Sequence, residues 1–321
     1  KLIFFSLIKI YTYKKKIDFM KFIVTGGAGF IGSHLTKFLI NNGHDVIVID
    51  DLSRGSMNNL HDIKNKIDFR QLDISNYNSI QNVTQNVDGI FHQAALGSVP
   101  QSFQEPKEYY KVIAIGTENI LKLAKKLDCK VVYASSSSVY GNQTKFPISE
   151  DAEKTPLNPY GESKLQAEKF AQKYAQDNVK VIGLRYFNVF GIGQNPNYAG
   201  VIPKFIERLL EHKPPIIEGD GTQVRNFVYI DDVVRANWMA FVSSVDHAFL
   251  NIATGITTSV NDLAKIMINL AGQKLEPEYV DSRHGDIRKS QADTSLAKKL
   301  IGWEPVFSLE EGLKEIFPKN N

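Results

Sequence analysis

FIVTGGAGFIG, residues 22–32, decides the fold of this chain, because a β-branched strand runs directly into a glycine-rich turn and then into an amphipathic helix. Gly26 permits the tight turn, Gly29 lets the backbone approach a pyrophosphate, and Gly32 allows close packing of the helix. The first amide groups of that helix face the anion. A tight turn without a ligand gives the same glycine pattern, but the strand-to-helix context favours a dinucleotide-binding loop.

Outward from this loop, the chain alternates short apolar runs with helical stretches, which is typical of a doubly wound parallel sheet. The predicted strands are Phe22 to Thr25, Val46 to Asp50, Asp68 to Leu72, Gly89 to His92, Val131 to Ser135 and Val181 to Arg185. Beyond Asn188 the alternation weakens. We therefore predict an α/β chain with a Rossmann-like NAD-binding domain at 20–187. A smaller, mainly substrate-binding domain at 188–321 follows, with some segments returning to the first.

Acidic residues close the second and third predicted strands. Asp50 is placed to accept hydrogen bonds from the adenosine ribose hydroxyls and to repel a 2′-phosphate, which favours NAD over NADP. Arg54 is the counter-argument, since an arginine can receive that phosphate, although a solvated loop charge explains it better. Asp73 fits a contact with adenine and the cap of a turn equally well.

A tyrosine and a lysine stand one helical turn apart in YGESK, residues 160–164. We expect the Lys164 ammonium to lower the pKa of the Tyr160 phenol, normally about 10, so that the phenolate accepts a proton from an alcohol. Helices often carry such pairs by chance. Four serines, 135–138, strengthen the case, because they follow a predicted strand at the edge where this kind of sheet binds ligands. We expect one of their hydroxyls to hold the reacting oxygen.

Eight ordered motifs between residues 21 and 313 resemble the extended short-chain dehydrogenase/reductase family, and within it the nucleotide-sugar 4-epimerases for UDP-glucose and UDP-N-acetylglucosamine. They are TGGAGFIGS at 25–33, DDLSRG at 50–55, FHQAALGSVPQS at 91–102, YASSSSVYG at 133–141, YGESK at 160–164, RYFNVFG at 185–191, VRNFVYIDD at 224–232 and RHGDIRKSQAD at 283–293. Agreement in this order is highly specific for the family.

The resemblance implies a role for individual residues. The catalytic set is Ser136, Tyr160 and Lys164. The NAD contacts, with those argued above, are Gly26, Gly29, Phe30, Ile31, Gly32, Asp50, Asp73, Ile74, Ala94, Ala95, Tyr160 and Lys164. The implied UDP-sugar contacts are Gly97, Ser98, Ser136, Ser137, Asn188, Gln194, Val201, Arg225, Arg283, Asp286 and Ser290. Arginine suits the diphosphate because its planar fork matches phosphate oxygens.

The resemblance also implies a reversible inversion at C4, in which Tyr160 removes the hydroxyl proton, NAD takes the hydride, and the 4-keto sugar turns over before the hydride returns. Related dehydratases and decarboxylases carry an acid just after the catalytic hydroxyl, where this chain has Ser137 and Ser138. Serine is a poor acid or base at neutral pH, which favours epimerisation. UDP-glucuronate 4-epimerases share SSSSVYG and remain rivals. A non-catalytic NAD-binding regulator is the alternative of another class.

Two features favour an N-acetylhexosamine substrate, UDP-GlcNAc or UDP-GalNAc, over UDP-glucose and UDP-galactose. The segments 94–100 and 194–196 resemble those of UDP-GlcNAc 4-epimerases. Ser290 stands seven residues after Arg283, where the family uses a bulky aromatic residue to exclude acetamido groups and a small one to admit them. We therefore expect an open pocket for the acetamido group.

The chain departs from the family pattern at three positions. Ile113 replaces an asparagine, Gln101 replaces an arginine, and Asn226 replaces an aspartate. We expect these changes to tune the activity rather than to abolish it. The helices around 109–126 and 160–174 resemble those through which family members dimerise, which favours a homodimer, although their apolar faces fit an internal core equally well.

Composition narrows the remaining classes. The 321 residues are 43% hydrophobic and 23% charged, as in an ordinary globular protein, and a net charge of +3 gives no argument for nucleic acid or an anionic membrane. The single cysteine, Cys129, excludes an internal disulfide framework and a cysteine-based zinc site, so we expect a cytoplasmic protein without a metal. Leu2 to Ile10 is shorter than the ~20 residues that span a bilayer, and the lysines 14–16 follow it. We predict that residues 1–19 are an appendage and that translation starts at Met20.

Overall fold

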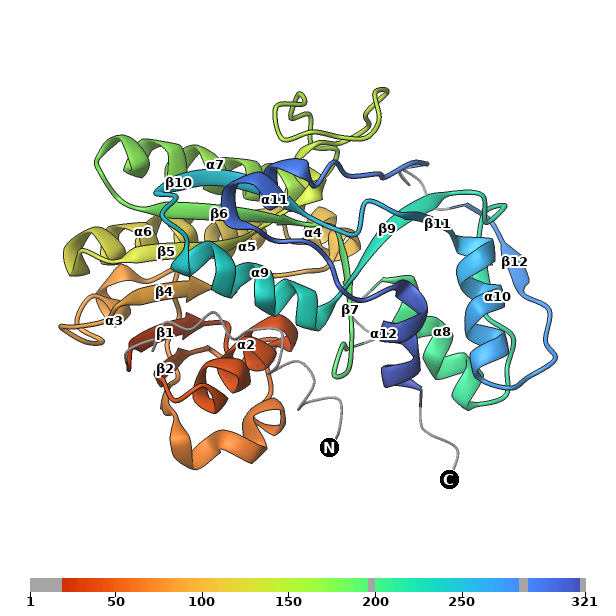
Figure 1. The fold of residues 1–321 in the computed structure, drawn as a ribbon, viewed down its shortest axis with the longest axis horizontal. Helices are drawn as coiled ribbons and strands as arrows, with labels where there is room; N and C mark the ends of the chain where they lie inside the picture. The colour runs from red at the N-terminus through yellow and green to blue at the C-terminus, as the bar shows by residue number, and fades with distance from the viewer. Residues whose placement is uncertain (1–18, 196–199, 283–287, 318–321) are drawn as a thin grey trace.

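A sheet of seven parallel strands forms the centre of the protein (Figure 1). The computed structural model describes residues 19–195, 200–282 and 288–317. In spatial order the strands are β10 (His247–Ile252), β6 (Val181–Tyr186), β5 (Lys130–Ser136), β4 (Gly89–His92), β1 (Lys21–Thr25), β2 (Asp45–Ile49) and β3 (Asp68–Arg70). The predicted α/β, Rossmann-like architecture is confirmed. Each of the six predicted strands is present, and β10 is the strand of this sheet that the prediction missed.

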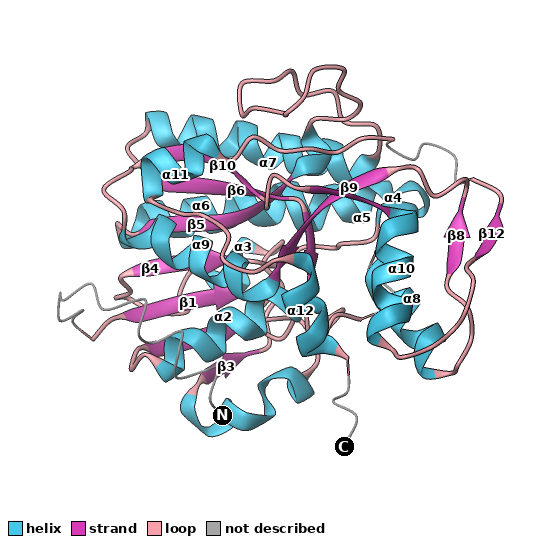
Figure 2. Cartoon of the chain, turned by 45° about the vertical axis from the view of Figure 1, so that its right-hand side comes forward, coloured by secondary structure: helices cyan, strands magenta, loops and turns pink. Residues whose placement is uncertain are grey.

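Helices cover both faces of this sheet (Figures 1 and 2). One face carries α2 (Phe30–Asn41), α9 (Ile230–Val242) and α11 (Ser295–Ile301), and the other carries α3 (Tyr77–Ile80), α6 (Gly116–Leu127) and α7 (Pro159–Gln176). The short helices α4 (Val99–Gln104) and α5 (Pro106–Tyr109) lead through a π-helical turn, Tyr110–Ile115, into α6. Within the described ranges, no helix combines the length and the apolar character that crossing a membrane requires.

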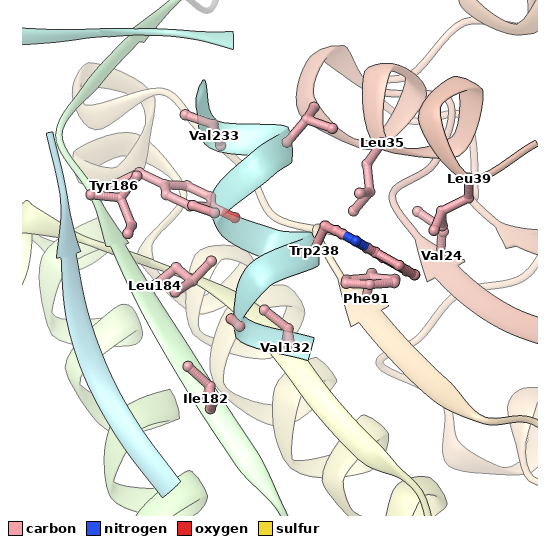
Figure 3. Close-up of a cluster of buried hydrophobic side chains, with 14 of the residues drawn as sticks. Val24, Leu35, Leu39, Phe91, Val132, Ile182, Leu184, Tyr186, Val233 and Trp238 are labelled. Atoms are coloured by element: carbon pink, nitrogen blue, oxygen red, sulfur yellow. The ribbon is translucent and has the colours of Figure 1, made fainter. Parts of the chain in front are cut away.

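Two apolar layers hold the helices to the sheet. Val24 and Phe91 point to the face of α2 and α9, where they pack with Trp238 (Figure 3). Ile23 and Ile90, their neighbours in sequence, point to the face of α6 and α7. Because successive side chains of a strand point to opposite faces, apolar strands of this kind are buried on both sides. These two layers hold the strands in place, and with them the strand ends that border the cavity described below.

The crevice for a ligand is set by the strand order. The chain runs from β1 to β2 on one side and then returns to place β4 on the other side of β1. In doubly wound sheets, ligands bind at the carboxyl ends of the strands where the order reverses in this way. The loops after β1 and β4 touch there, since a Cβ added at Gly26 would lie 2.5 Å from the amide nitrogen of Ala94.

The C-terminal part of the chain has two small sheets and three helices of its own (Figure 2). One sheet has the order β11 (Thr257–Ser259), β9 (Val224–Tyr229) and β7 (Asn188–Phe190), and the other pairs β12 (Glu278–Val280) with β8 (Ile216–Glu218). The helices α8 (Val201–Leu210), α10 (Val260–Leu270) and α12 (Leu309–Ile316) pack with the first of these sheets around a separate apolar core.

A buried aspartate ties the last segment of the chain to the beginning of α9. The Asp232 carboxylate, which is 0% exposed, accepts hydrogen bonds from the backbone amides of Val306 and Phe307, each at 3.0 Å. Trp303 donates its indole N–H to the Asp232 carbonyl at 2.9 Å. Asp232, the last residue of the predicted motif at 224–232, therefore holds the C-terminal segment in place.

Candidate active site

A cavity of about 590 Å³ lies at the carboxyl ends of β1, β2, β4, β5 and β6, where the sheet meets the C-terminal part of the chain. Pockets of this volume are typical of small-molecule and cofactor sites. The predicted residues that line it are Gly26, Gly29, Phe30, Ile31, Gly32, Asp50, Asp73, Ile74, Ala94, Ala95, Gly97, Ser136, Tyr160, Lys164, Asn188, Gln194, Val201 and Arg225. One cavity thus brings together the glycine loop, the Tyr-Lys pair (Tyr160 and Lys164) and most of the predicted substrate contacts.

Five predicted residues are not in the lining that the described residues form. Arg283 and Asp286 lie outside those residues. Ser98 caps α4 with its side chain, and Ser137 begins a 3₁₀ turn after β5. The backbone amide of Ser290 donates to the carbonyl of Val224 on β9. Substrate contacts by these residues therefore stay predictions.

Close backbone packing shapes the glycine loop. The amide of Gly26, whose φ is +66°, donates to the carbonyl of Ile49 at 2.7 Å and so joins the turn to β2. A Cβ added at Gly32 would lie 2.1 Å from the Gly26 carbonyl oxygen, so only glycine fits. Gly29 stands at the N-cap of α2 and has no side chain to occupy the first amides of the helix. This arrangement leaves those amides facing the cavity, as an anion site requires.

Asp50 lies at the end of β2 and is 7% exposed. Its carboxylate accepts hydrogen bonds from the backbone amides of Ala28 at 2.9 Å and Leu52 at 2.8 Å. Burial raises the pKa of Asp50 from its ordinary value, and these two bonds oppose that shift. The residues thus fit the adenosine end of NAD. Arg54 also lines the cavity, and its guanidinium donates to the side chain of Gln101 at 3.0 Å.

Asp73 caps a turn, which is one of the two roles that the sequence allows. Its carboxylate accepts hydrogen bonds from the Ser75 amide at 2.8 Å and from the Ser75 hydroxyl at 2.7 Å. Asp73 also lines the cavity. A contact with adenine therefore stays a prediction that is compatible with the turn.

A buried histidine supports the glycine loop from below. His92 Nδ1 accepts a hydrogen bond from the Thr25 hydroxyl at 2.6 Å, and its Nε2 donates to the Thr117 hydroxyl at 3.0 Å. That hydroxyl in turn donates to the carbonyl of Ile113. Burial lowers the pKa of His92 to about 3, and the charge of Lys164 acts in the same direction. His92 is thus a neutral structural residue beside the cofactor loop.

This histidine predicts a dependence of stability on pH. The unfolded chain binds a proton at His92 below about pH 6.5, whereas the folded chain binds it only near the folded pKa of about 3. The contribution of neutral His92 to the free energy of unfolding is therefore fully present above pH 6.5. It falls with decreasing pH, by about 2 kcal/mol between pH 7 and pH 5. Urea unfolding at both pH values measures the change. His92→Gln, which does not titrate, should lose that much less stability than the wild type, and an equal loss in both proteins would contradict the assignment.

The first turn of α7 places the Tyr-Lys pair at the cavity. Asn158 caps this helix, because its side-chain oxygen accepts from the Gly161 amide at 2.8 Å, and Pro159 at the first position has the backbone angle that a helix needs. Lys164 then lies one turn after Tyr160 on the same face. Its ammonium is 5.9 Å from the centre of the Tyr160 ring.

Ser136 completes the predicted catalytic set. It lies at the end of β5, is 7% exposed, and forms a side-chain hydrogen bond with Tyr160. The Ser136 hydroxyl also accepts from the Ser138 amide at 3.1 Å, which holds the hydroxyl at the opening of the turn. Serine and phenol oxygens therefore sit together at the cavity wall, as transfer of a proton from a sugar hydroxyl requires.

The charges at this site differ from the expectation. Burial raises the pKa of Tyr160 above its ordinary value, whereas the hydrogen bond with Ser136 lowers it and Tyr109 raises it. Burial also lowers the pKa of Lys164 to about 8, against the opposing charge of Glu168. The expectation that Lys164 lowers the pKa of Tyr160 is wrong for the chain alone. The physical reason is that burial of the Tyr160 phenol has the largest effect on its pKa, while Lys164 donates to the Ala134 carbonyl at 2.6 Å.

The chain is similar to known proteins over almost its whole length. A model of the NAD dependent epimerase/dehydratase family matches residues 22–253. The chain belongs to this family. A putative UDP-glucose 4-epimerase of Methanocaldococcus jannaschii is 39% identical to it over 306 residues, which are 93% of this chain and 98% of that protein. The predicted family and NAD as its cofactor are thereby confirmed.

Two solved structures of the epimerase type are similar over almost the whole length. The UDP-glucose 4-epimerase of Thermotoga maritima with UDP-glucose is 40% identical, with a TM-score of 0.88 over 92% of this chain and 97% of that one. The UDP-N-acetylglucosamine 4-epimerase of Methanobrevibacter ruminantium M1 in complex with UDP-N-acetylmuramic acid is 34% identical. Its TM-score is 0.89, over 93% of this chain and 97% of that one.

The side of the cavity where the sequence predicts the substrate is built from β7, β9 and the segment after β7. Asn188 donates its side-chain amide to the carbonyl of Asn226 at 3.1 Å, which sets its position between the two strands. Gln194 donates to the Val189 carbonyl at 3.0 Å, and its side-chain oxygen is buried without a partner among the described residues. Buried polar groups need partners, so this oxygen fits a ligand donor.

Several lining residues were missed by the sequence analysis. Tyr186 and Gln93 line the cavity, and the Tyr186 hydroxyl donates to the Gln93 side-chain oxygen at 3.2 Å. Asn237 donates to the same hydroxyl at 2.8 Å. Their signal was available, because Tyr186 ends β6 and Gln93 directly follows β4, both at the carboxyl edge. Lys204, Glu218 and Gln223 also line the cavity, and nothing in their local sequence marks them.

The three departures from the family pattern have clear structural settings. Ile113 is buried in the π-helical turn and belongs to the apolar cluster that contacts Tyr160. Gln101 bonds to Arg54, as described above. The side-chain oxygen of Asn226 accepts from the Thr254 amide and hydroxyl, each at 2.9 Å, but its buried NH₂ has no partner among the described residues. An aspartate would keep both bonds and would place an acceptor oxygen where Asn226 has that unpaired donor.

Proposed function

We propose that this protein is an NAD-dependent UDP-sugar 4-epimerase, an isomerase that inverts C4 through a 4-keto sugar. The observation that carries the proposal is the meeting of Ser136 with the Tyr-Lys pair at one wall of the cavity whose other wall is the glycine loop. Epimerase-type relatives of the same length support it.

The residues divide the chemistry among them. Tyr160 takes the proton of the C4 hydroxyl, and Ser136 holds the same oxygen through its hydroxyl. Lys164 supplies a positive charge near the phenol and fixes the end of β5 through its bond to Ala134. When NAD is bound between the glycine loop and this wall, it supplies a reversible hydride acceptor and a positive charge that favours the phenolate.

Inversion is favoured over elimination by the residues after the catalytic serine. Ser137 and Ser138 occupy the positions where related dehydratases and decarboxylases carry an acid. A hydroxyl does not exchange protons readily at neutral pH, so abstraction of a proton from a second carbon has no base at this place. A UDP-glucuronate 4-epimerase, which does not need this base, remains the second candidate because it shares the SSSSVYG segment.

We infer a preference for UDP-GlcNAc and UDP-GalNAc, with UDP-glucose and UDP-galactose as poorer substrates. Ser290 is small, half-buried and hydrogen-bonded through its backbone next to β9, the strand that carries Arg225. A small side chain there leaves room for an acetamido group. The side-chain oxygen of Gln194, which has no partner among the described residues, fits the N–H of that group.

Incubation of the purified protein with four UDP-sugars tests this function. UDP-GlcNAc, UDP-GalNAc, UDP-glucose and UDP-glucuronate are each followed by NMR for inversion at C4. We expect the two N-acetyl sugars to interconvert fastest. Turnover of UDP-glucose or UDP-glucuronate alone would reject the preferred substrate, and a lack of turnover with all four would favour the non-catalytic regulator.

Ser290→Tyr tests the specificity separately. The ring would fill the space assigned to the acetamido group, so kcat/KM for UDP-GlcNAc should fall at least about 100-fold while that for UDP-glucose changes less than about threefold. Ser290→Ala, which stays small, should keep both values. Equal losses for both sugars in Ser290→Tyr would contradict a specificity role.

We also propose a homodimer. The apolar faces of α6 and α7 are used inside the chain, where Ile120, Leu123 and Ala171 pack on the sheet, so a dimer would use the outer sides of these helices. Light scattering on the purified protein measures its mass, and a monomer at micromolar concentration would reject the proposal. The cytoplasmic location stays a prediction.

A further inference from the structure

The end of β5 is tied to α7 at three successive residues. Two ties are the contacts of the Tyr-Lys pair with residues 136 and 134. The third lies between them, because the Ser135 hydroxyl donates to Glu168 Oε1 at 2.6 Å. Glu168 is one turn beyond Lys164 on the same face of α7, so the helix and the strand end meet along a single line.

Glu168 is itself fixed by an ion pair that solvent does not reach. Arg185, on β6, donates from Nε to Glu168 Oε1 and from Nη2 to Oε2, both at 2.8 Å, and each side chain is 2% exposed. Nη1 of Arg185 donates to the Tyr140 hydroxyl and to the Glu150 carbonyl, also at 2.8 Å. Hydrogen bonds therefore hold both oxygens of the Glu168 carboxylate.

Stability alone does not account for this arrangement. Removing two charges from water costs so much that apolar side chains of similar size often replace a buried ion pair without loss. This ion pair lies against the end of β5, where Glu168 Oε1 also accepts a hydrogen bond from the Ser135 hydroxyl. Glu168 reaches Ser136 through the hydroxyl of the neighbouring Ser135, so its effect on the position of that serine is geometric.

We propose that Ser135, Glu168 and Arg185 are positioning residues that hold the end of β5 at the distance from α7 at which Ser136 and Tyr160 share a proton. The inference rests on the proposed oxidation of a sugar hydroxyl by Tyr160. Displacement of a catalytic group by about 1 Å can lower a rate by about 100-fold, so one hydrogen bond at this point has a large effect.

Ser135→Ala is the sharpest test. It removes a single hydroxyl, and Glu168 keeps both bonds to Arg185, so the ion pair and the fold remain. We expect kcat for C4 inversion to fall about tenfold, the KM for the sugar to change less than about twofold, and the melting temperature to change by only a few degrees. A direct contact of Ser135 with the sugar, whose cavity it also lines, would instead raise KM.

Titration of Tyr160 provides a second readout that needs no sugar. The absorbance change near 295 nm, taken as the difference from the matching Tyr160→Phe protein, follows this phenol alone. Lys164 from α7 and Tyr109 from α5 face the phenol and are unchanged. Because Ser135→Ala loosens the bond between Ser136 and Tyr160, the midpoint should move to higher pH by about half a unit or more.

Ser163→Ala is the matched control. Ser163 is as buried as Ser135 and lies on α7, where its hydroxyl donates to the Pro159 carbonyl of the same helix. In Ser163→Ala, kcat and the Tyr160 titration should therefore stay as in the wild type. An unchanged kcat and titration in Ser135→Ala would overturn the positioning role. A shifted titration in a protein whose wild type inverts no UDP-sugar would overturn the proposed function and support the positioning role.

Discussion

Tyr160→Phe is expected to lower kcat for C4 inversion by about 10² to 10⁴-fold while NAD stays bound. The substitution removes the one atom that accepts the sugar proton. It leaves the ring, which packs in the apolar cluster with Tyr109 and Ile113. Its hydroxyl bonds to the Ser136 side chain, which keeps its bond to the Ser138 amide, so the fold should be preserved. Steady-state kinetics with the best substrate, together with NAD content from absorbance, measures the two effects.

Tyr174→Phe is the control for this result, because it deletes the same atom on the same helix, α7, far from the cavity lining. It should turn over sugars like the wild type. Retained activity in Tyr160→Phe would show that another group takes the proton. Loss of activity together with loss of NAD would show that the phenol serves cofactor binding instead.

Gly32→Ala is expected to destabilise the protein by about 3 kcal/mol or more and to weaken NAD binding at least about 100-fold. The added Cβ would lie 2.1 Å from the Gly26 carbonyl oxygen and 2.8 Å from the Gly27 Cα. Both are backbone atoms in the turn that must receive the pyrophosphate. Either the turn opens or α2 moves away from β1, and both outcomes remove amides from the anion site. Denaturant unfolding and calorimetric NAD titration measure the two losses.

Gly29→Ala separates the two effects. Its Cβ would meet only the Gly26 oxygen, at 3.1 Å, so the fold should hold while the methyl group blocks the approach of the pyrophosphate. We expect near-normal unfolding and weak NAD binding in this variant. Normal NAD affinity in Gly32→Ala would contradict the assignment of this loop.

The parts of the fold that depend on residues close together in the chain could be predicted from the sequence. The strand before Gly26 and the strand before Ser135 are β-branched, and each is followed by the small residues that a ligand edge needs. Asn158 and Pro159 likewise indicate the start of α7, and within that helix Tyr160 and Lys164 lie one turn apart. Short-range signals of this kind depend on propensity and turn chemistry, so they survive without knowledge of the tertiary structure.

What could not be predicted depends on residues that meet only after folding. The pKa of Tyr160 follows from burial, and burial is a property of everything packed around it. Glu168 and Arg185 are 17 residues apart in the chain, and no motif of the sequence indicates that they pair with each other or with Ser135. The π-helical turn beside Ile113 has no sequence signal that we can name.

The position of β10 limits how this protein can be divided. β10 comes 61 residues after β6 ends, counting from Tyr186 to His247, yet it forms the edge of the same sheet beside β6. A fragment that stops at residue 187 would leave β6 as an open edge with unpaired backbone groups and uncovered apolar side chains, which favours aggregation. The cofactor-binding half is therefore not a detachable module, and any fusion or exchange between relatives must carry both halves together.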